Sequence, residues 1–84
     1  MISFEESAFS EYYQWAKDDK KIFGKINALI KDIIRDPFYG IGKPEPLKWD
    51  LTGLWSRRIT EEHRLVYKVL PENIIIISCK YHYQ

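Results

Sequence analysis

Two stretches decide how this chain folds: Leu54-Trp55-Ser56-Arg57-Arg58-Ile59 and, three residues later, His63-Arg64-Leu65-Val66-Tyr67-Lys68-Val69. Each alternates apolar and polar residues, the period-two pattern of half-buried strands. The connector Thr60-Glu61-Glu62 is short and polar, so the sequence predicts an antiparallel hairpin. In the second strand, one face would carry Leu65, Tyr67 and Val69, and the other would carry Arg64, Val66 and Lys68.

The predicted hairpin gathers three arginines, Arg57, Arg58 and Arg64, with His63 beside them. Exposed charge pairs contribute little to stability, so the fold alone does not require such a cluster. In the ordinary interpretation, Arg58 and Arg64 pair with nearby glutamates and His63 is structural. In the functional interpretation, the guanidinium groups hold a phosphate in a bidentate manner, which lysine cannot do.

Length and composition limit the remaining possibilities. A chain of 84 residues has room for one domain, 1–84, with one modest core. A formal net charge of +1 argues against nucleic-acid binding through bulk charge, but it allows a local basic face. The single cysteine, Cys79, excludes an internal disulfide, and its apolar surroundings in the sequence predict a buried, inert thiol.

Targeting and metal-binding patterns are not found in the sequence. There is no secretory signal and no apolar run of membrane-spanning length, so we expect a soluble cytoplasmic protein without a membrane partner. The two histidines and one cysteine lack the spacing of a metal finger, so we expect neither a metal site nor a cofactor.

The first half of the chain predicts two helices joined by a very short link. Ser3-Phe4-Glu5-Glu6 has the form of a capping box that would start a helix near Phe4, although residues 1–4 also fit an edge strand. A second helix would be capped by an aspartate and end at Asp36-Pro37. Its Gly24 suggests a close contact between the helices, which should pack as an antiparallel pair on the sheet. Its apolar stripe is Ile22, Ile26, Leu29, Ile30 and Ile33.

The segment from Phe38 to Trp49 is predicted to be a loop rich in glycine and proline. Within it, Glu45 lies between two prolines, so its backbone is held extended and its carboxylate has a stiff support. After a turn at residues 71–73, Ile74-Ile75-Ile76-Ile77 predicts a central strand that continues to Gln84.

Several residues outside the hairpin have both an ordinary and a chemical interpretation. Glu45 is ordinarily a solvated carboxylate, but it suits a general base. Tyr81-His82-Tyr83 fits a frayed strand end, or a general acid beside rings that stack on bases, an interaction of about 1–3 kcal/mol. Lys43 and Lys48 are ordinarily solvated, but could add to a surface that binds a nucleic-acid backbone. Together these residue types fit metal-free cleavage of RNA.

Four motifs resemble those of the YoeB (Txe) toxins, which belong to the RelE/ParE superfamily of bacterial toxin–antitoxin systems. They are Lys43-Pro44-Glu45-Pro46-Leu47-Lys48, Gly53-Leu54-Trp55-Ser56-Arg57-Arg58-Ile59, Glu62-His63-Arg64-Leu65-Val66-Tyr67 and Cys79-Lys80-Tyr81-His82-Tyr83. Their order and spacing make the resemblance specific, and it spans nearly the whole chain.

This resemblance implies an α+β fold in which two N-terminal helices pack on a small, twisted, mainly antiparallel sheet. It also implies a ribosome-dependent mRNA endonuclease, or mRNA interferase, that cuts translated messages in the A site. A YefM-like antitoxin would hold such a toxin inactive, and a homodimer would fit the family.

The resemblance also assigns roles to individual residues. It places the general base at Glu45, the transition-state arginine at Arg64, the general acid at His82 and an active-site tyrosine at Tyr83. Accessory basic residues fall at Lys48 and Arg58, and we add Lys43 and Arg57 to this predicted RNA-binding set. Two positions depart from the family pattern: Trp49 stands where a polar or basic residue is common, and Gln84 follows the usual last tyrosine.

Two other classes of function remain open at this point. A gyrase poison of the ParE type would use the same scaffold, although such toxins lack this set of glutamate, arginine and terminal histidine and tyrosine. A binding module would occupy the ribosome or an antitoxin without cutting RNA.

Overall fold

The predicted hairpin is present in the computed structural model, which describes residues 1–81. Strand β3 (Leu54–Arg58) pairs antiparallel with β4 (Arg64–Leu70). Leu65 and Tyr67 have no exposed surface, which confirms the apolar face predicted for β4. Val66 on the opposite face is also buried, so that face is apolar at its centre and basic only toward the two ends of the strand.

The hairpin forms the middle of a five-stranded sheet within residues 1–81, with the strand order β1-β5-β4-β3-β2. Strand β5 (Asn73–Ser78) pairs antiparallel with β4 and parallel with β1 (Ile2–Phe4). The isoleucine run therefore forms an interior strand, as predicted, but the strand ends at Ser78, so its predicted extension through residues 79–81 is wrong. The short β2 (Glu45–Pro46), predicted as loop, pairs with β3, and a 3-10 helix, η1 (Trp49–Leu51), lies between them in sequence.

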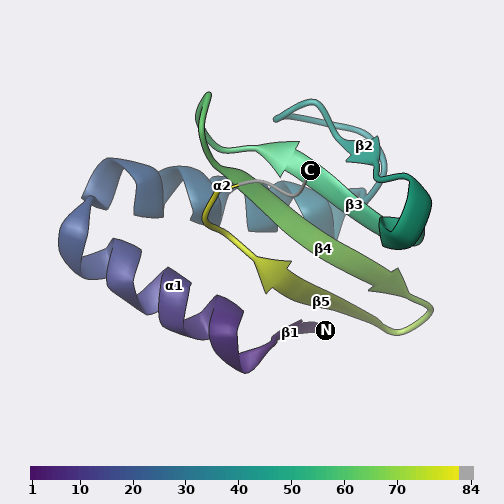
Figure 1. The fold of residues 1–84 in the computed structure, drawn as a ribbon, viewed down its shortest axis with the longest axis horizontal. Helices are drawn as coiled ribbons and strands as arrows, with labels where there is room; N and C mark the ends of the chain where they lie inside the picture. Colours follow the sequence, from purple (N-terminus) through teal and green to yellow (C-terminus); the bar gives the residue numbers. More distant parts are fainter. Residues whose placement is uncertain (82–84) are drawn as a thin grey trace.

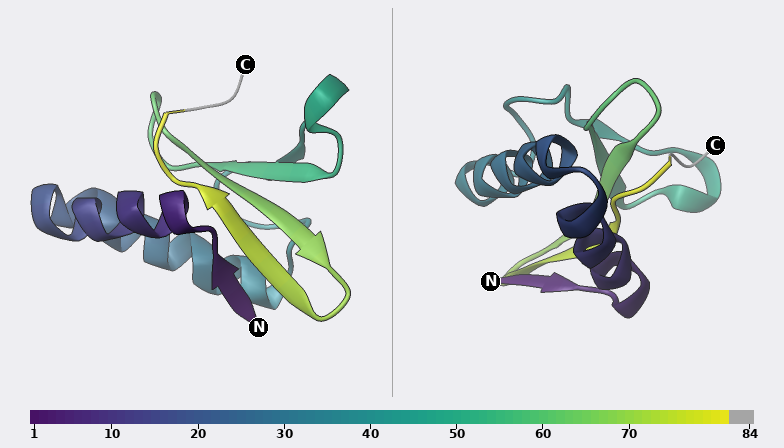
Figure 2. Two further views of the ribbon diagram at one scale, coloured as in Figure 1. Left: turned by 60° about the horizontal axis from the view of Figure 1, so that its bottom comes forward. Right: turned by 90° about the vertical axis from the view of Figure 1, so that its left-hand side faces the viewer.

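Both helices lie on one face of this sheet (Figure 1 and Figure 2). They are α1 (Glu6–Asp18) and α2 (Lys20–Arg35), and the α+β class is confirmed. An aspartate caps α2, as predicted: the side chain of Asp19 accepts hydrogen bonds from the backbone N–H groups of Lys21 and Ile22, each at 3.1 Å.

The capping box predicted at Ser3 is wrong. Residues 2–4 form β1, and α1 begins at Glu6 without a side-chain cap at Glu5. The backbone N–H of Glu5 instead donates to the carbonyl of Ile76 at 2.9 Å. Pairing with β5 satisfies the backbone of this segment, so the local capping signal is overridden by a contact across the whole chain.

The helices contact each other through aromatic side chains and not through Gly24. The rings of Tyr12 and Phe23 lie 4.8 Å apart, and the Tyr12 hydroxyl donates to the Asn27 side chain at 2.7 Å. A Cβ built at Gly24 would have no atom within 4 Å, so the predicted close approach at this glycine is wrong. The apolar stripe of α2 does form the core, since Ile26, Leu29 and Ile33 are fully buried. Within residues 1–81, neither helix combines the length and apolarity that crossing a membrane requires.

Cys79 lies in this core between α1 and the end of β5. Its backbone N–H donates to the Glu11 carboxylate at 2.8 Å, and its carbonyl accepts from the Trp15 indole at 2.9 Å. Burial, with a smaller effect of the Glu11 charge, raises the pKa of the Cys79 thiol to about 12. The prediction of a buried thiol is confirmed, and its raised pKa favours low reactivity.

We therefore expect Cys79 to react with an aromatic disulfide reagent at pH 8 at least about a hundredfold more slowly in the native protein than in denaturant, because the thiolate is rare and shielded. Absorbance of the released thiol follows the reaction, and the single cysteine makes the signal unambiguous. Reaction of the native protein at the denatured rate would contradict the buried position.

Candidate active site

The sheet has a second face, opposite the two helices (Figure 2). Directly paired residues in antiparallel strands point to the same face, so the strand register defines this surface. Glu45 pairs with Ser56 and Ser56 with Val66, while Arg58 pairs with Arg64 one step along the same face. We call this surface the basic face; its residues are Glu45, Ser56, Arg58, Arg64, Val66 and Lys68.

Glu45 and the two arginines are close enough on this face to act on one group. Strands lie about 4.8 Å apart and alternate residues about 6.8 Å apart, so the Cα atoms of Glu45 and Arg64 are separated by roughly 12 Å. Long side chains from both positions can reach a phosphodiester held between them. Strand alternation and register alone therefore bring together the predicted base and the predicted transition-state arginine.

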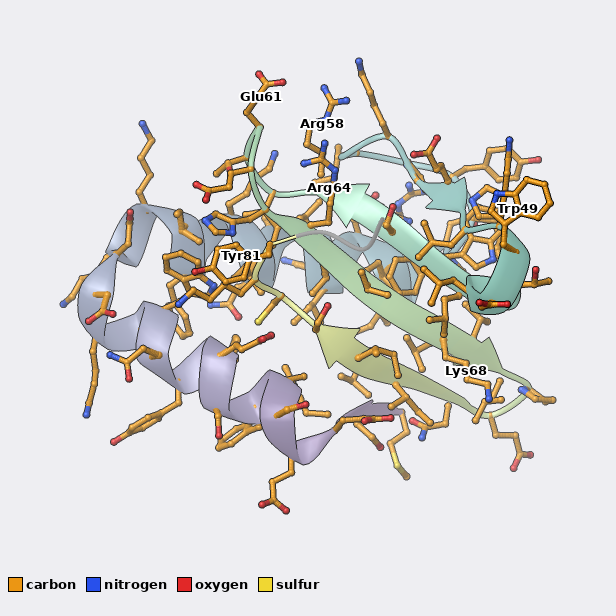
Figure 3. The ribbon with its side chains drawn as sticks, in the orientation of Figure 1. Trp49, Arg58, Glu61, Arg64, Lys68 and Tyr81 are labelled. Atoms are coloured by element: carbon orange, nitrogen blue, oxygen red, sulfur yellow. The ribbon has the colours of Figure 1, made fainter. Side chains whose placement is uncertain are left out.

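Arg58 and Arg64 lie side by side at the end of the hairpin (Figure 3). The Arg58 side chain is exposed and has no hydrogen-bond partner among residues 1–81. One terminal nitrogen of Arg64, Nη1, donates to the carbonyls of Thr60, Glu61 and His63 at 2.7, 3.0 and 3.1 Å.

These contacts hold the Arg64 guanidinium at the hairpin turn and leave part of it available. Its Nε and Nη2 donors have no partner within residues 1–81, and neither Arg58 nor Arg64 forms an ion pair with a carboxylate in that part of the chain. The ordinary interpretation, in which these arginines pair with glutamates, is therefore wrong for the described residues. Two guanidinium groups on one face can bind an anion.

Glu45 is exposed and is held in place from both sides. On one side, the backbone N–H of Leu47 donates to the Leu54 carbonyl at 2.9 Å. On the other, the Gly42 carbonyl accepts from the Arg58 N–H at 2.6 Å. Gly42 has a φ of +80°, and a Cβ there would lie 2.7 Å from Leu29, so only glycine allows the loop to pass this close to α2.

Arg57 is on the helix-side face and is fully buried. Its Nη1 donates to Asp32 of α2 at 2.6 Å and to the Ile41 carbonyl at 3.1 Å, and its Nη2 donates to the Asp36 carbonyl at 2.6 Å. Its Nε donates to the Tyr67 hydroxyl at 3.1 Å. The prediction that Arg57 binds RNA is therefore wrong, because its donors are used inside the protein.

Asp32 is the residue that sequence reasoning missed, because a polar residue in an amphipathic helix ordinarily faces solvent. Its carboxylate accepts from Arg35, from Arg57 and from the Ile41 N–H. These hydrogen bonds, that of Arg35 first and that of Arg57 second, hold the pKa of Asp32 well below its usual range. A signal was available: Arg57 stands opposite Leu65 in the hairpin, so it shares the apolar face and requires a buried partner.

The other predicted residues are placed as follows. Lys43 and Lys48 are exposed, on either side of Glu45 in the loop. Trp49, which departs from the family pattern, is 88% exposed. His63 is buried. His82 and Tyr83 lie outside the described residues, so their predicted approach to Glu45 and Arg64 stays a prediction.

Residues 4–83 match a family model described as the YoeB-like toxin of bacterial type II toxin–antitoxin systems. The chain belongs to this family. It is 56% identical over 82 residues to Toxin YoeB of Escherichia coli, with 98% of each chain covered. It is 55% identical over 83 residues to Toxin YoeB of Synechocystis, with 99% of this chain and 96% of the relative covered. The predicted family is confirmed, and the chain is a toxin of a type II toxin–antitoxin system.

Solved structures of YoeB proteins share this fold. A YoeB/ParE toxin from Agrobacterium tumefaciens superposes with a TM-score of 0.94 at 45% identity, covering 98% of both chains. A YoeB dimer from Staphylococcus aureus gives 0.91 at 54% identity, covering 98% of this chain and 95% of the other. The toxin in a heterotetrameric YoeB–YefM complex from the same species also gives 0.91 at 54% identity, covering 99% and 97%. The YafQ toxin of Escherichia coli, at 16% identity and a TM-score of 0.78, shares the fold alone.

The contrast between the adjacent arginines can be measured. Arg57→Met removes the buried donor that Asp32, two carbonyls and the Tyr67 hydroxyl share, so we expect the free energy of unfolding to fall by about 3–5 kcal/mol. The matched control Arg58→Met removes an exposed group and should change it by less than about 0.5 kcal/mol. Urea unfolding followed by circular dichroism gives both values, and equal losses would contradict the assignment of Arg57 to the interior.

The low pKa of Asp32 predicts an acid-sensitive contribution to stability. Because the folded pKa lies below the unfolded value of about 3.9, this contribution is complete above pH 4 and is lost as the pH falls toward the folded pKa. The difference in unfolding free energy between the wild type and Asp32→Asn should therefore shrink below pH 4. Urea unfolding from pH 6 to pH 2.5 tests this, and a difference that stays constant would refute it.

Proposed function

We propose that this toxin is a ribosome-dependent mRNA endonuclease that cuts translated messages in the A site and so inhibits translation. The observation that supports this most directly is the basic face: Glu45, Arg58 and Arg64 share it, and neither arginine is neutralised by a carboxylate within residues 1–81. A carboxylate facing two available guanidinium groups is suited to a reaction in which a phosphate gains negative charge.

In the proposed reaction, the 2′-hydroxyl of a message nucleotide attacks the adjacent phosphorus. Glu45 takes the hydroxyl proton as general base. Arg64, assisted by Arg58 and Lys48, stabilises the additional negative charge on the phosphate oxygens. His82 protonates the departing 5′-oxygen, and Tyr83 holds a base or a phosphate oxygen. The products are a 2′,3′-cyclic phosphate and a 5′-hydroxyl, and the scheme uses no metal ion.

The ribosome would supply what a domain of this size lacks. The candidate residues lie on an exposed surface, so the toxin alone does not constrain a flexible RNA strand. Message held in the A site is already oriented, which removes much of the entropic cost of aligning the 2′-hydroxyl with the phosphate. The exposed Lys43 and Lys48 would add backbone contacts beside Glu45, whereas Arg57 is not part of this RNA-binding set.

Partners follow from the family and from this mode of action. The YoeB of Staphylococcus aureus has been solved both as a dimer and in a complex with YefM. We propose that this toxin is likewise held inactive by a YefM-like antitoxin and that it forms a homodimer when free. Its target, translating ribosomes, places it in the cytoplasm.

Three variants test the proposed chemistry on ribosome-bound message in a purified translation system. Glu45→Gln removes the base and should lower the cleavage rate by about 10²–10⁴-fold. Arg64→Met removes transition-state stabilisation and should lower it by about 10²–10³-fold. The matched control Lys68→Met removes a basic residue of the same face, level with Leu54, and should retain the rate within about twofold.

Mapping the 5′ ends of the message distinguishes the alternatives in the same experiment. Discrete internal cuts with 5′-hydroxyl ends support the endonuclease. Stalled but intact messages would indicate a non-catalytic binding module, and DNA damage in cells without message cleavage would indicate a gyrase poison. Full activity of both Glu45→Gln and Arg64→Met would refute the assigned roles.

A further inference from the structure

The backbone of Tyr81 is held at both of its polar groups by two consecutive residues of the hairpin. Its N–H donates to Nδ1 of His63 at 2.8 Å. Its carbonyl accepts from the N–H of Arg64 at 2.8 Å. Tyr81 lies after the end of β5, so these bonds fix a segment that no strand pairing holds.

Tyr81 also has a backbone conformation that needs support. Its φ is +59°, in the left-handed region that side chains with a Cβ rarely adopt. A residue keeps such a conformation only where its surroundings enforce it. The hydrogen bond that Tyr81 donates to His63 and the one that it accepts from Arg64 provide that enforcement.

The imidazole of His63 is itself fixed by packing. It is 7% exposed, with its ring centre 5.0 Å from the Trp15 indole in an edge-on arrangement and 5.5 Å from the Tyr81 ring. Because Nδ1 accepts a hydrogen bond from the Tyr81 N–H, the proton of the neutral ring is on Nε2. Nε2 in turn lies 3.5 Å from the Glu62 carboxylate.

We propose that His63 is a positioning residue for RNA cleavage: through Nδ1 it fixes the backbone of Tyr81, the residue directly before the proposed general acid His82 in the sequence. This inference rests on the proposed function. Arg64 anchors the same segment through its backbone N–H while its side chain lies on the basic face. His63 and Arg64 together therefore fix the backbone of Tyr81 relative to the arginine that would hold the phosphate.

A pair of variants separates the acceptor from the ring. His63→Phe keeps an aromatic ring between Trp15 and Tyr81 but leaves the Tyr81 N–H without an acceptor. His63→Asn lacks the ring but keeps an oxygen that can occupy the position of Nδ1. If the acceptor positions the acid, His63→Phe lowers kcat about ten- to a hundredfold with little change in KM for ribosome-bound message, since small displacements at a reacting centre have effects of this size. His63→Asn should recover kcat to within about fivefold of the wild type, even though it is the less stable variant.

The opposite order overturns the inference. If His63→Phe cleaves like the wild type, or if activity follows thermal stability, so that His63→Asn is the poorer enzyme, His63 contributes only packing. If the wild type does not cleave ribosome-bound message, the proposed function is wrong, and so is the positioning role that rests on it. The two failures are thus distinguishable in one set of reactions.

Hydrogen exchange at the Tyr81 amide provides a test that does not depend on catalysis or on the yield of a variant. In the wild type this amide should exchange at least about tenfold more slowly than in an unstructured peptide, because its proton is in a hydrogen bond. The ¹⁵N shifts of His63 should report the tautomer with the proton on Nε2. An unprotected Tyr81 amide, or a proton on Nδ1 near neutral pH, would contradict the hydrogen bond from Tyr81 to His63 and overturn the inference.

Discussion

The buried guanidinium of Arg57 is the interaction on which the arrangement of the site depends. It joins Asp32 of α2, the carbonyls of residues 36 and 41, and the Tyr67 hydroxyl of β4. A buried charge that lost any of these partners would be costly, so the helix, the loop and the sheet are held in one relative placement. Ile41 belongs to this network, and the chain continues from it through Gly42 to Glu45. The network therefore fixes the start of the segment that bears the exposed carboxylate.

Strand alternation then explains how two adjacent arginines come to have different roles. Arg57 and Arg58 point to opposite faces of β3, so one is used inside the protein and the other remains on the surface. The hairpin register extends this division to β4, where Leu65 lies opposite Arg57 and Arg64 lies opposite Arg58. A shift of one residue would exchange the two faces, so the apolar residues that fix the register also fix which arginines face the solvent.

The sequence was sufficient where the signal was local. The alternation of the hairpin, the Asp19 cap and the apolar stripe of α2 were predicted correctly because each depends on neighbours along the chain. Local patterns gave wrong predictions where distant segments decide the structure. The capping box at Ser3 does not form because β1 pairs with β5. The predicted helix contact at Gly24 is absent, since a Cβ there would have no atom within 4 Å. At the site, motif resemblance pointed to Glu45 and Arg64, which the strand register places on one face, and the hairpin alternation placed Arg57 on the face of Leu65. No local pattern showed that Asp32 is the partner of Arg57 or that His63 holds Tyr81.

These observations give the hairpin two connected roles. From one side, β3 holds the loop that bears Glu45, through the Arg58 N–H and the Leu54 carbonyl. From the other, the first residues of the β4 side hold Tyr81, through His63 Nδ1 and the Arg64 N–H. The loop that bears the proposed base and Tyr81, which precedes the proposed acid in the sequence, are therefore both attached to the pair of strands that carries Arg58 and Arg64. Because hydrogen bonds between these strands determine the spacing of all four attachments, a small sheet can hold residues that are distant in the sequence in a defined relation.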